Sequence, residues 1–187
     1  MERESYLRVT DILAPLSGID RVPKAILEAA AARGTLVHSC VNWFINEGDW
    51  VGVTDEVAPY VESFKAWYKP GMKTLTTEER FYDDELCITG QVDFIYNDEH
   101  GNAYLIDFKT SSKPQCSWAV QLAAYKHLAA LAGVTIDRMG VVHLKKDGTP
   151  ADLYYYDYDH HFGLFMDCYR VYKYFFNKKG KPEYEFE

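Results

Sequence analysis

Residues 90–109, GQVDFIYNDEHGNAYLIDFK, constrain the fold of this chain more than any other segment. They read as two apolar strands joined by the polar turn NDEHGN, and each strand carries an acid where a core residue is expected, Asp93 in the first and Asp107 in the second. Strand side chains alternate between faces, so Asp107 and Lys109 share one face, and the hairpin can bring Asp93 to it. Burying these charges is costly unless something uses them. A divalent cation held by the carboxylates beside the lysine is the simplest use.

The composition is that of a folded protein with a substantial core. The chain has 187 residues, of which 48% are hydrophobic and 16% aromatic, so we expect a single domain over residues 1–187. No apolar run approaches the roughly 20 residues that cross a bilayer, and the first residues lack an apolar signal segment. We therefore expect a cytoplasmic, intracellular protein with no membrane partner. The four cysteines are scattered without a C-x-x-C pair, which predicts no zinc ribbon and no iron–sulfur cluster.

The charge limits the kinds of nucleic-acid contact to expect. A formal net charge of −8 argues against non-specific coating of nucleic acid. A local basic rim can still steer a phosphate backbone, although each lysine can equally be an ordinary solvated side chain. The candidates are Lys65, Lys69, Lys73, Lys113, Lys126, Lys145 and Lys146.

Hydrophobic periodicity outlines the other elements. Apolar residues recur at helical spacing in five segments, and shorter apolar runs bounded by turn residues mark five strands. We expect helices over residues 7–13, 23–45, 56–68, 117–131 and 159–176, and strands over 73–82, 85–96, 103–109, 139–144 and 153–156. This order predicts an α/β fold with a mixed central β-sheet flanked by helices.

The residues around Asp107 have both a chemical and a structural interpretation. The backbone carbonyl of Phe108 can complete a half-cage of oxygen ligands around magnesium. Lys109 can hold an attacking water or stabilise charge on a phosphate, or it can simply pair with the acids. The hydroxyls of Thr110 and Ser111 can contact phosphate or cap the following helix.

Two helical positions add weaker signals. Gln121 and Tyr125 are four residues apart and so share a helix face, which is either a functional stripe or an ordinary surface. His38 follows Gly34 in the phrase GTLVH, and a neutral imidazole is a good metal ligand, although a lone helical histidine is more often structural.

The phrase TTEERFY supplies one more acid. Glu78 or Glu79 can provide a further metal ligand or anchor a water. Only one of the two can face the site, because neighbouring strand residues point in opposite directions.

Taken together, five motifs resemble those of the PD-(D/E)xK nuclease superfamily, in particular its RecB-like exonuclease branch, which includes phage and mobile-element proteins. In chain order they are G-T-x-x-H at 34–38, T-E-E at 77–79, G-x-V-D at 90–93, I-D-F-K-T at 106–110 and Q-x-x-x-Y at 121–125. The resemblance implies a restriction-endonuclease-like core. It also implies that Asp93 and Asp107 bind metal, that Lys109 is the catalytic lysine, and that His38 is a ligand for a second metal.

The same resemblance assigns the remaining positions. Gln121 and Tyr125 would position the lysine and the scissile DNA strand. Glu78 is favoured over Glu79 because T-E-x-x-F-Y matches the family's usual phrase. The implied cofactors are one or two Mg²⁺ or Mn²⁺ ions.

The resemblance implies a metal-dependent DNA exonuclease that acts in recombination, repair or phage replication. Trp43, Trp118 and Tyr125 are candidates for stacking on unpaired bases, which favours single-stranded or free DNA ends as the substrate. The chain has no Walker loop, so unwinding would come from a helicase or recombination partner. A structure-specific endonuclease on the same fold and a catalytically idle nucleic-acid-binding module are the alternatives, and the sequence does not indicate the oligomeric state.

Overall fold

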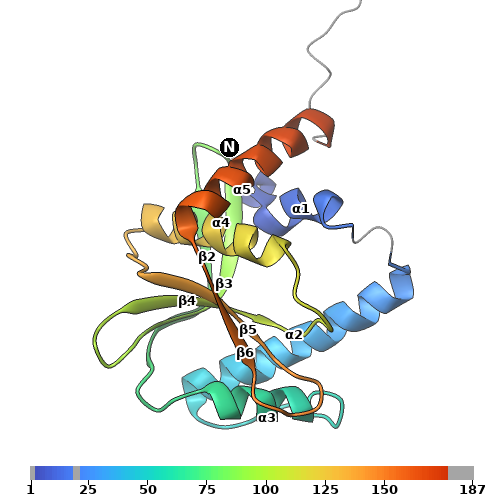
Figure 1. The fold of residues 1–187 in the computed structure, drawn as a ribbon, viewed down its shortest axis with the longest axis vertical. Helices are drawn as coiled ribbons and strands as arrows, with labels where there is room; N and C mark the ends of the chain where they lie inside the picture. The colour runs from blue at the N-terminus through green and yellow to red at the C-terminus, as the bar shows by residue number, and fades with distance from the viewer. Residues whose placement is uncertain (1–2, 19–21, 177–187) are drawn as a thin grey trace, which may run out of the picture.

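The fold is built on one six-stranded mixed sheet (Figure 1). The structure is a computed structural model that describes residues 3–18 and 22–176. The strands are β1 (Leu7–Arg8), β2 (Lys73–Asp83), β3 (Ile88–Asn97), β4 (Ala103–Lys109), β5 (Arg138–His143) and β6 (Asp152–Tyr156). They run in the order β1-β3-β4-β5-β6, and β2 pairs with β3. The pairs β2–β3, β3–β4 and β5–β6 are antiparallel, whereas β1–β3 and β4–β5 are parallel.

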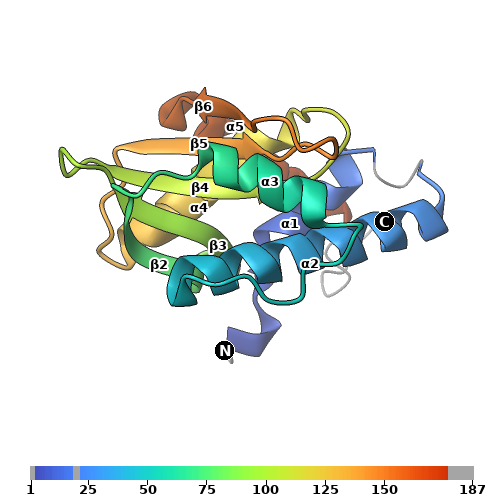
Figure 2. The ribbon, with the colours of Figure 1, turned by 90° about the horizontal axis from the view of Figure 1, so that it is seen from below.

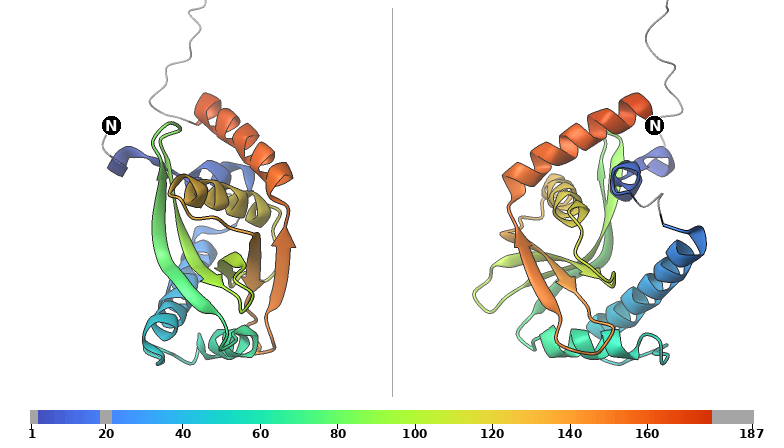
Figure 3. Two further views of the ribbon diagram at one scale, coloured as in Figure 1. Left: turned by 90° about the vertical axis from the view of Figure 1, so that its left-hand side faces the viewer. Right: turned by 45° about the vertical axis from the view of Figure 1, so that its right-hand side comes forward.

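Helices cover both faces of this sheet. They are η1 (Arg3–Ser5), α1 (Val9–Leu13), η2 (Ala14–Leu16), α2 (Lys24–Glu47), α3 (Ala58–Trp67), α4 (Ser117–Leu131) and α5 (Tyr158–Phe175). Helices α2 and α3 pack on one face, and α1, α4 and α5 pack on the other (Figures 2 and 3). The mixed α/β sandwich expected from the periodicity is confirmed, and it is consistent with a restriction-endonuclease-like core.

Each face of the sheet has its own core. One core joins Leu105 and Val141 of the sheet to Leu122 and Leu128 of α4. The other joins alternate sheet residues, such as Ile106 and Phe108, to α2 and α3. The alternation of Leu105, Ile106, Asp107 and Phe108 therefore directs Asp107 towards the α4 side.

The expected elements are found with small shifts at their ends. The helix over residues 117–131 has the expected bounds, and α2 continues without a break through Gly34 to Gly48, which ends it with φ +75°. Two expectations are wrong in part. Residues 7 and 8 form strand β1 rather than the start of a helix, because they pair with Ile88 and Thr89. The strand expected from residue 85 begins at Ile88, because Asp83 accepts the Glu85 and Leu86 N–H groups in a turn.

Within the described residues, none of the helices is both long and apolar enough to span a bilayer.

Candidate active site

The site begins where two neighbouring strands part. Strand β4 pairs with β3 from Phe94 to Asn97, and this ladder stops one residue short of Asp93. Extending the register by one step sets Asp93 opposite Asp107. At Phe108 the ladder with β3 has ended, and the Phe108 N–H instead donates to the side-chain oxygen Asp93 Oδ2 at 2.7 Å. The Asp93 side chain thus satisfies a backbone donor at the point where the sheet opens.

Asp107 and Lys109 do share a face and are in contact. Lys109 Nζ lies 2.7 Å from Asp107 Oδ2, and the exposed fractions of the two side chains are 22% and 3%. The Oδ2 atom is buried and receives no well-aligned hydrogen bond from the part of the chain that the structure describes. Asp107 therefore has a carboxylate oxygen that is shielded from solvent and can still accept a hydrogen bond.

Helix α4 fixes this pair through one amide. Gln121 Oε1 accepts from Lys109 Nζ at 3.1 Å, and its Nε2 donates to Asp107 Oδ1 at 3.1 Å and to the Tyr125 hydroxyl at 2.9 Å. Both ends of the amide are satisfied only in this orientation, because a flipped amide would place a donor against the lysine. Gln121 and Tyr125 therefore lie at the site, in contact with each other.

Gly90 makes room for Tyr125. A Cβ on Gly90 would lie 2.5 Å from Tyr125 Cε1 and 3.0 Å from Leu128 Cδ1. The sequence motif G-x-V-D contains this glycine, yet its role was not foreseen, because only the packed structure brings α4 over β3.

His38 of α2 joins the site from the opposite face of the sheet. Its Nε2 lies 2.9 Å from the Phe108 carbonyl oxygen, and its Nδ1 lies 3.3 Å from Asp93 Oδ1. A carbonyl only accepts hydrogen bonds, so Nε2 carries a proton and Nδ1 is the nitrogen directed at the acids. The Phe108 carbonyl, expected as a metal ligand, thus also orients His38 and retains one lone pair.

Glu78, rather than Glu79, faces this group. Among the described residues, His38, Glu78 and Asp93 form a set whose potential ligand atoms lie within 4.8 Å of one another. Glu78 Oε2 also accepts from Gln91 Nε2 at 2.6 Å, a contact that sequence reasoning missed. Glu79 lies instead beside Thr76 Oγ1, at 3.3 Å.

The backbone at Glu78 is strained. Its φ of +52° is in the left-handed region, which costs a non-glycine residue about 1–3 kcal/mol. Such strained residues cluster at functional sites, where the surrounding structure holds them in place.

The electrostatics show a group of charges held together by their mutual interactions. Burial acts to lower the pKa of His38, but attraction to Asp93 outweighs it and raises that pKa to about 9. Burial acts to raise the pKa of Asp93, yet the charge on His38 keeps it below its usual value. Burial raises the pKa of Asp107 to about 6 against the opposing effect of Lys109. Burial and the nearby Asp93 also raise the pKa of Glu78.

These residues fit a divalent metal ion. The carboxylates of Glu78 and Asp93 and the imidazole of His38 converge, and the Phe108 carbonyl borders this group. Asp107 lies outside that set, and its buried Oδ2 has no well-aligned hydrogen bond within the described residues. Carboxylate and carbonyl oxygens are ligands for hard divalent cations, and the imidazole adds a nitrogen ligand.

Two substrate-contact expectations change. The Ser111 hydroxyl already donates to the Lys113 carbonyl at 3.0 Å, which leaves it only as an acceptor, whereas Thr110 makes no hydrogen bond within the described residues. Stacking of bases on Trp118 or Tyr125 is wrong, because the residues are only 2% and 4% exposed. Trp43 is 49% exposed, but five residues after His38 it points about 140° away around the helix.

Comparison with known proteins agrees with this geometry at the level of the family. No curated protein matches the chain. Among solved structures, the crystal structure of SSO0001 is similar at 14% sequence identity, with 91% of this chain and 78% of that chain covered and a TM-score of 0.44. A family model matches residues 50–162, more than half of the chain, and these residues include both aspartates, the lysine and the glutamine described above. That match and the convergence of its acidic and basic residues at one opening of the sheet place this chain in the PD-(D/E)XK nuclease superfamily.

Proposed function

We propose that this nuclease is a metal-dependent DNA exonuclease that hydrolyses phosphodiester bonds from free or single-stranded ends. The observation that supports it most is the buried pair Asp107 and Lys109, joined through Gln121 beside the His38, Glu78 and Asp93 group. Three of the residues in the five motifs that carry the resemblance to the RecB-like exonuclease branch, His38, Gln121 and Tyr125, also lie against this centre. Recombination, repair or phage replication is the setting that we propose for it.

The metal would be held by groups from four elements. Asp93 and Asp107, with Glu78 and the Nδ1 atom of His38, would bind one or two Mg²⁺ or Mn²⁺ ions, and the free lone pair of the Phe108 carbonyl would add an oxygen. The bound metal would supply Lewis-acid stabilisation of charge and lower the pKa of a bound water. The hydrogen bond from His38 Nε2 to Phe108 would hold the ring so that Nδ1 remains the ligand atom.

Lys109 would act on the reacting group directly. Its ammonium donates to Gln121 and pairs with Asp107, so at least one of its three protons would remain free to orient a water or to contact a phosphate oxygen. Gln121 and Tyr125 are then positioning residues, which hold the lysine and the carboxylate in one arrangement. Thr110, next in the chain, would contact the substrate phosphate, with Ser111 in a lesser role as an acceptor. A helicase or recombination protein would open duplex substrates.

Digestion of end-labelled DNA tests this proposal. Single- and double-stranded DNA, and RNA of the same sequence, would be incubated with Mg²⁺ or Mn²⁺, with the Lys109→Ala variant as the matched control. Mononucleotides and short oligomers that depend on Lys109 would support the exonuclease. Discrete internal cuts would instead indicate a structure-specific endonuclease. Binding of DNA in EDTA without cleavage in any metal would indicate an idle binding module and overturn the proposal.

A further inference from the structure

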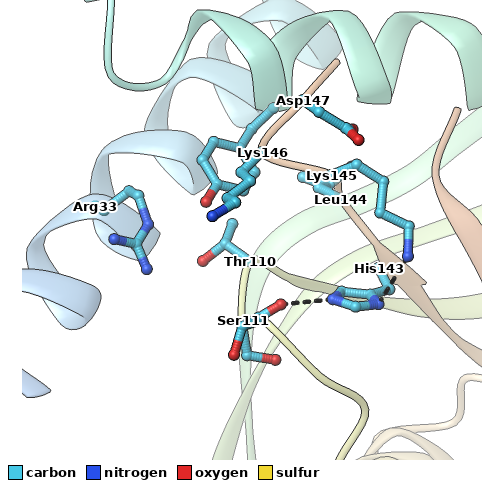
Figure 4. A pocket seen from close by; sticks show the side chains of 10 residues that line it. Arg33, Thr110, Ser111, His143, Leu144, Lys145, Lys146 and Asp147 are labelled. Carbon is cyan, nitrogen blue, oxygen red and sulfur yellow. Dashed lines mark hydrogen bonds between the residues drawn. The ribbon is translucent and has the colours of Figure 1, made fainter. Parts of the chain in front are cut away.

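A polar cavity is lined in part by Thr110, the residue that follows Lys109 (Figure 4). It has a volume of about 310 Å³ and is lined by residues from α2 and α3, from the segment after β4, and from the end of β5 and the loop that follows it. Thr110, which lines it, directly follows Lys109, so the two Cα atoms are about 3.8 Å apart. The cavity therefore lies where β4 ends, at the residue that follows Lys109.

Two cationic side chains in the cavity make no hydrogen bond within the described residues. Arg33 Nε is buried without one, Arg33 Nη1 lies 3.9 Å from the carboxylate of the exposed Glu56, and the guanidinium carbon lies 5.9 Å from the centroid of the Tyr60 ring. Lys146 makes no ion pair or hydrogen bond within the described residues. In Figure 4, Arg33, Thr110 and Lys146 face the same space from three different elements. A buried guanidinium donor without a partner is costly, which indicates that something else satisfies it.

The other charged groups of the cavity are already engaged. Lys145 pairs with Asp152 and donates to His143 Nδ1, while His143 Nε2 donates to the Ser111 carbonyl. This chain of bonds fixes the floor of the cavity. Asp147 accepts from the backbone and hydroxyl of Thr149, and its carboxylate lies on the far side from Arg33. Within the described residues, Arg33 and Lys146 are thus the cationic side chains of the cavity that make no hydrogen bond, although the chain as a whole carries a formal net charge of −8.

We propose that this basic pocket (Arg33, Thr110 and Lys146) binds a phosphate group of the substrate strand next to the one that is cleaved. The proposal rests on the proposed nuclease function and adds a second, fixed anchoring point to it. A guanidinium fork, an ammonium and a hydroxyl are the groups that proteins use for phosphate oxygens. Their role would be to set the register of the strand, so that one defined phosphodiester lies at Lys109.

The test measures binding without cleavage. Single-stranded oligonucleotides with an internal fluorophore would be titrated with the full chain in EDTA, by fluorescence anisotropy over a series of KCl concentrations. We expect Arg33→Gln/Lys146→Gln to bind more weakly and to lower the slope of log Kd against log[KCl] by about 0.7 for each lost contact. Arg170→Gln is the matched control, because the Arg170 side chain is 68% exposed on α5 and, among the residues described, forms an ion pair with Asp167 alone. Lys146→Gln alone, at an exposed loop position, keeps the test valid if the Arg33 variant folds poorly.

Three oligonucleotides identify the source of the phosphate. They carry a 5′-phosphate, a 3′-phosphate or two hydroxyl ends. A loss confined to one phosphorylated end would assign the pocket to a terminal phosphate, and an equal loss for all three would assign it to an internal phosphodiester. Unchanged affinity and slope for all three in both variants would overturn the proposal, even if the chain cleaves DNA. The opposite result, a loss of binding in a chain that cuts no substrate, would support the pocket while removing the nuclease function.

Discussion

The ring of Tyr125 occupies the space that a side chain on Gly90 would need, since a Cβ there would lie 2.5 Å from Tyr125 Cε1. The tyrosine hydroxyl accepts from Gln121, whose amide bridges Asp107 and Lys109. The lack of a side chain at Gly90 thus determines how closely α4 approaches strand β3. Through α4 it also determines the position of the proposed catalytic lysine.

Gly90→Ala should therefore damage both stability and cleavage. The added methyl group has to displace a buried ring, and such overpacking costs about 1–3 kcal/mol of unfolding free energy. Chemical denaturation measures this loss, and the double variant with Tyr125→Ala should lose less than the sum of the two single changes. Gly163→Ala is the control, because nothing lies within 4 Å of its added Cβ and it is in helix α5. Equal effects of the two glycine changes would contradict this account.

Removing either charge of the buried pair should abolish cleavage while the fold remains. Lys109→Ala and Asp107→Asn each remove a group that would act in the transition state, so we expect at least about a 10²-fold loss of rate. Asp107→Asn should also raise the melting temperature at pH 7.5, because burial disfavours the carboxylate and raises its pKa to about 6. Circular dichroism and end-labelled DNA check both parts. A well-folded Lys109→Ala that cuts at the parent rate would remove the lysine from the mechanism.

Metal binding should release a proton from His38. Its pKa of about 9 means that the imidazole is protonated at pH 7.5, whereas a metal ligand must give up the proton on Nδ1. Mn²⁺ affinity should therefore rise about tenfold per pH unit between pH 7 and 8.5. Calorimetry in two buffers of different ionisation enthalpy should find about one proton released at pH 7.5. His38→Gln should release none, and unchanged proton release in that variant would exclude His38 as the ligand.

The same histidine predicts how stability depends on pH without metal. The folded-state pKa of His38, about 9, lies above its unfolded value of 6.5, so its contribution is complete below pH 6.5 and is lost as the pH rises through 9. Urea denaturation in EDTA at pH 6 and pH 9.5 should show a decrease in unfolding free energy that is smaller in His38→Gln. A decrease of the same size in both proteins would assign it to other groups.

The aromatic core beneath α2 and α3 should carry much of the stability. Phe64 is fully buried and lies against Phe44, Trp50 and Phe108, with ring centroids 5.5–6.0 Å apart. Phe64→Ala should cost about 3–5 kcal/mol of unfolding free energy. Phe175→Ala, at a position 71% exposed, should change it by less than about 0.5 kcal/mol. Urea denaturation of the two variants gives the comparison.

Local patterns in the chain were enough to predict most of the helices and strands, though not β1, and one half of the site. Alternation along β4 placed Asp107 and Lys109 on one face, and the bounds of α4 followed from its apolar spacing. Both depend on the covalent geometry of a strand or a helix, which repeats every two or 3.6 residues whatever surrounds it. The five motifs indicated the superfamily because their residues and their order can be read directly from the sequence.

The rest of the site depended on contacts between distant segments. The parting of β3 from β4 at Asp93, the inward turn of Glu78 at a positive φ, and the space that Gly90 leaves for Tyr125 appear only when helices pack on the sheet. Arg33 and Lys146 lie 113 positions apart in the sequence, and no periodicity relates them. The direction of a strand side chain is set by local covalent geometry. Contacts between residues that are distant in the sequence depend instead on which apolar faces of helices and sheet pack together, so only the tertiary structure determined them.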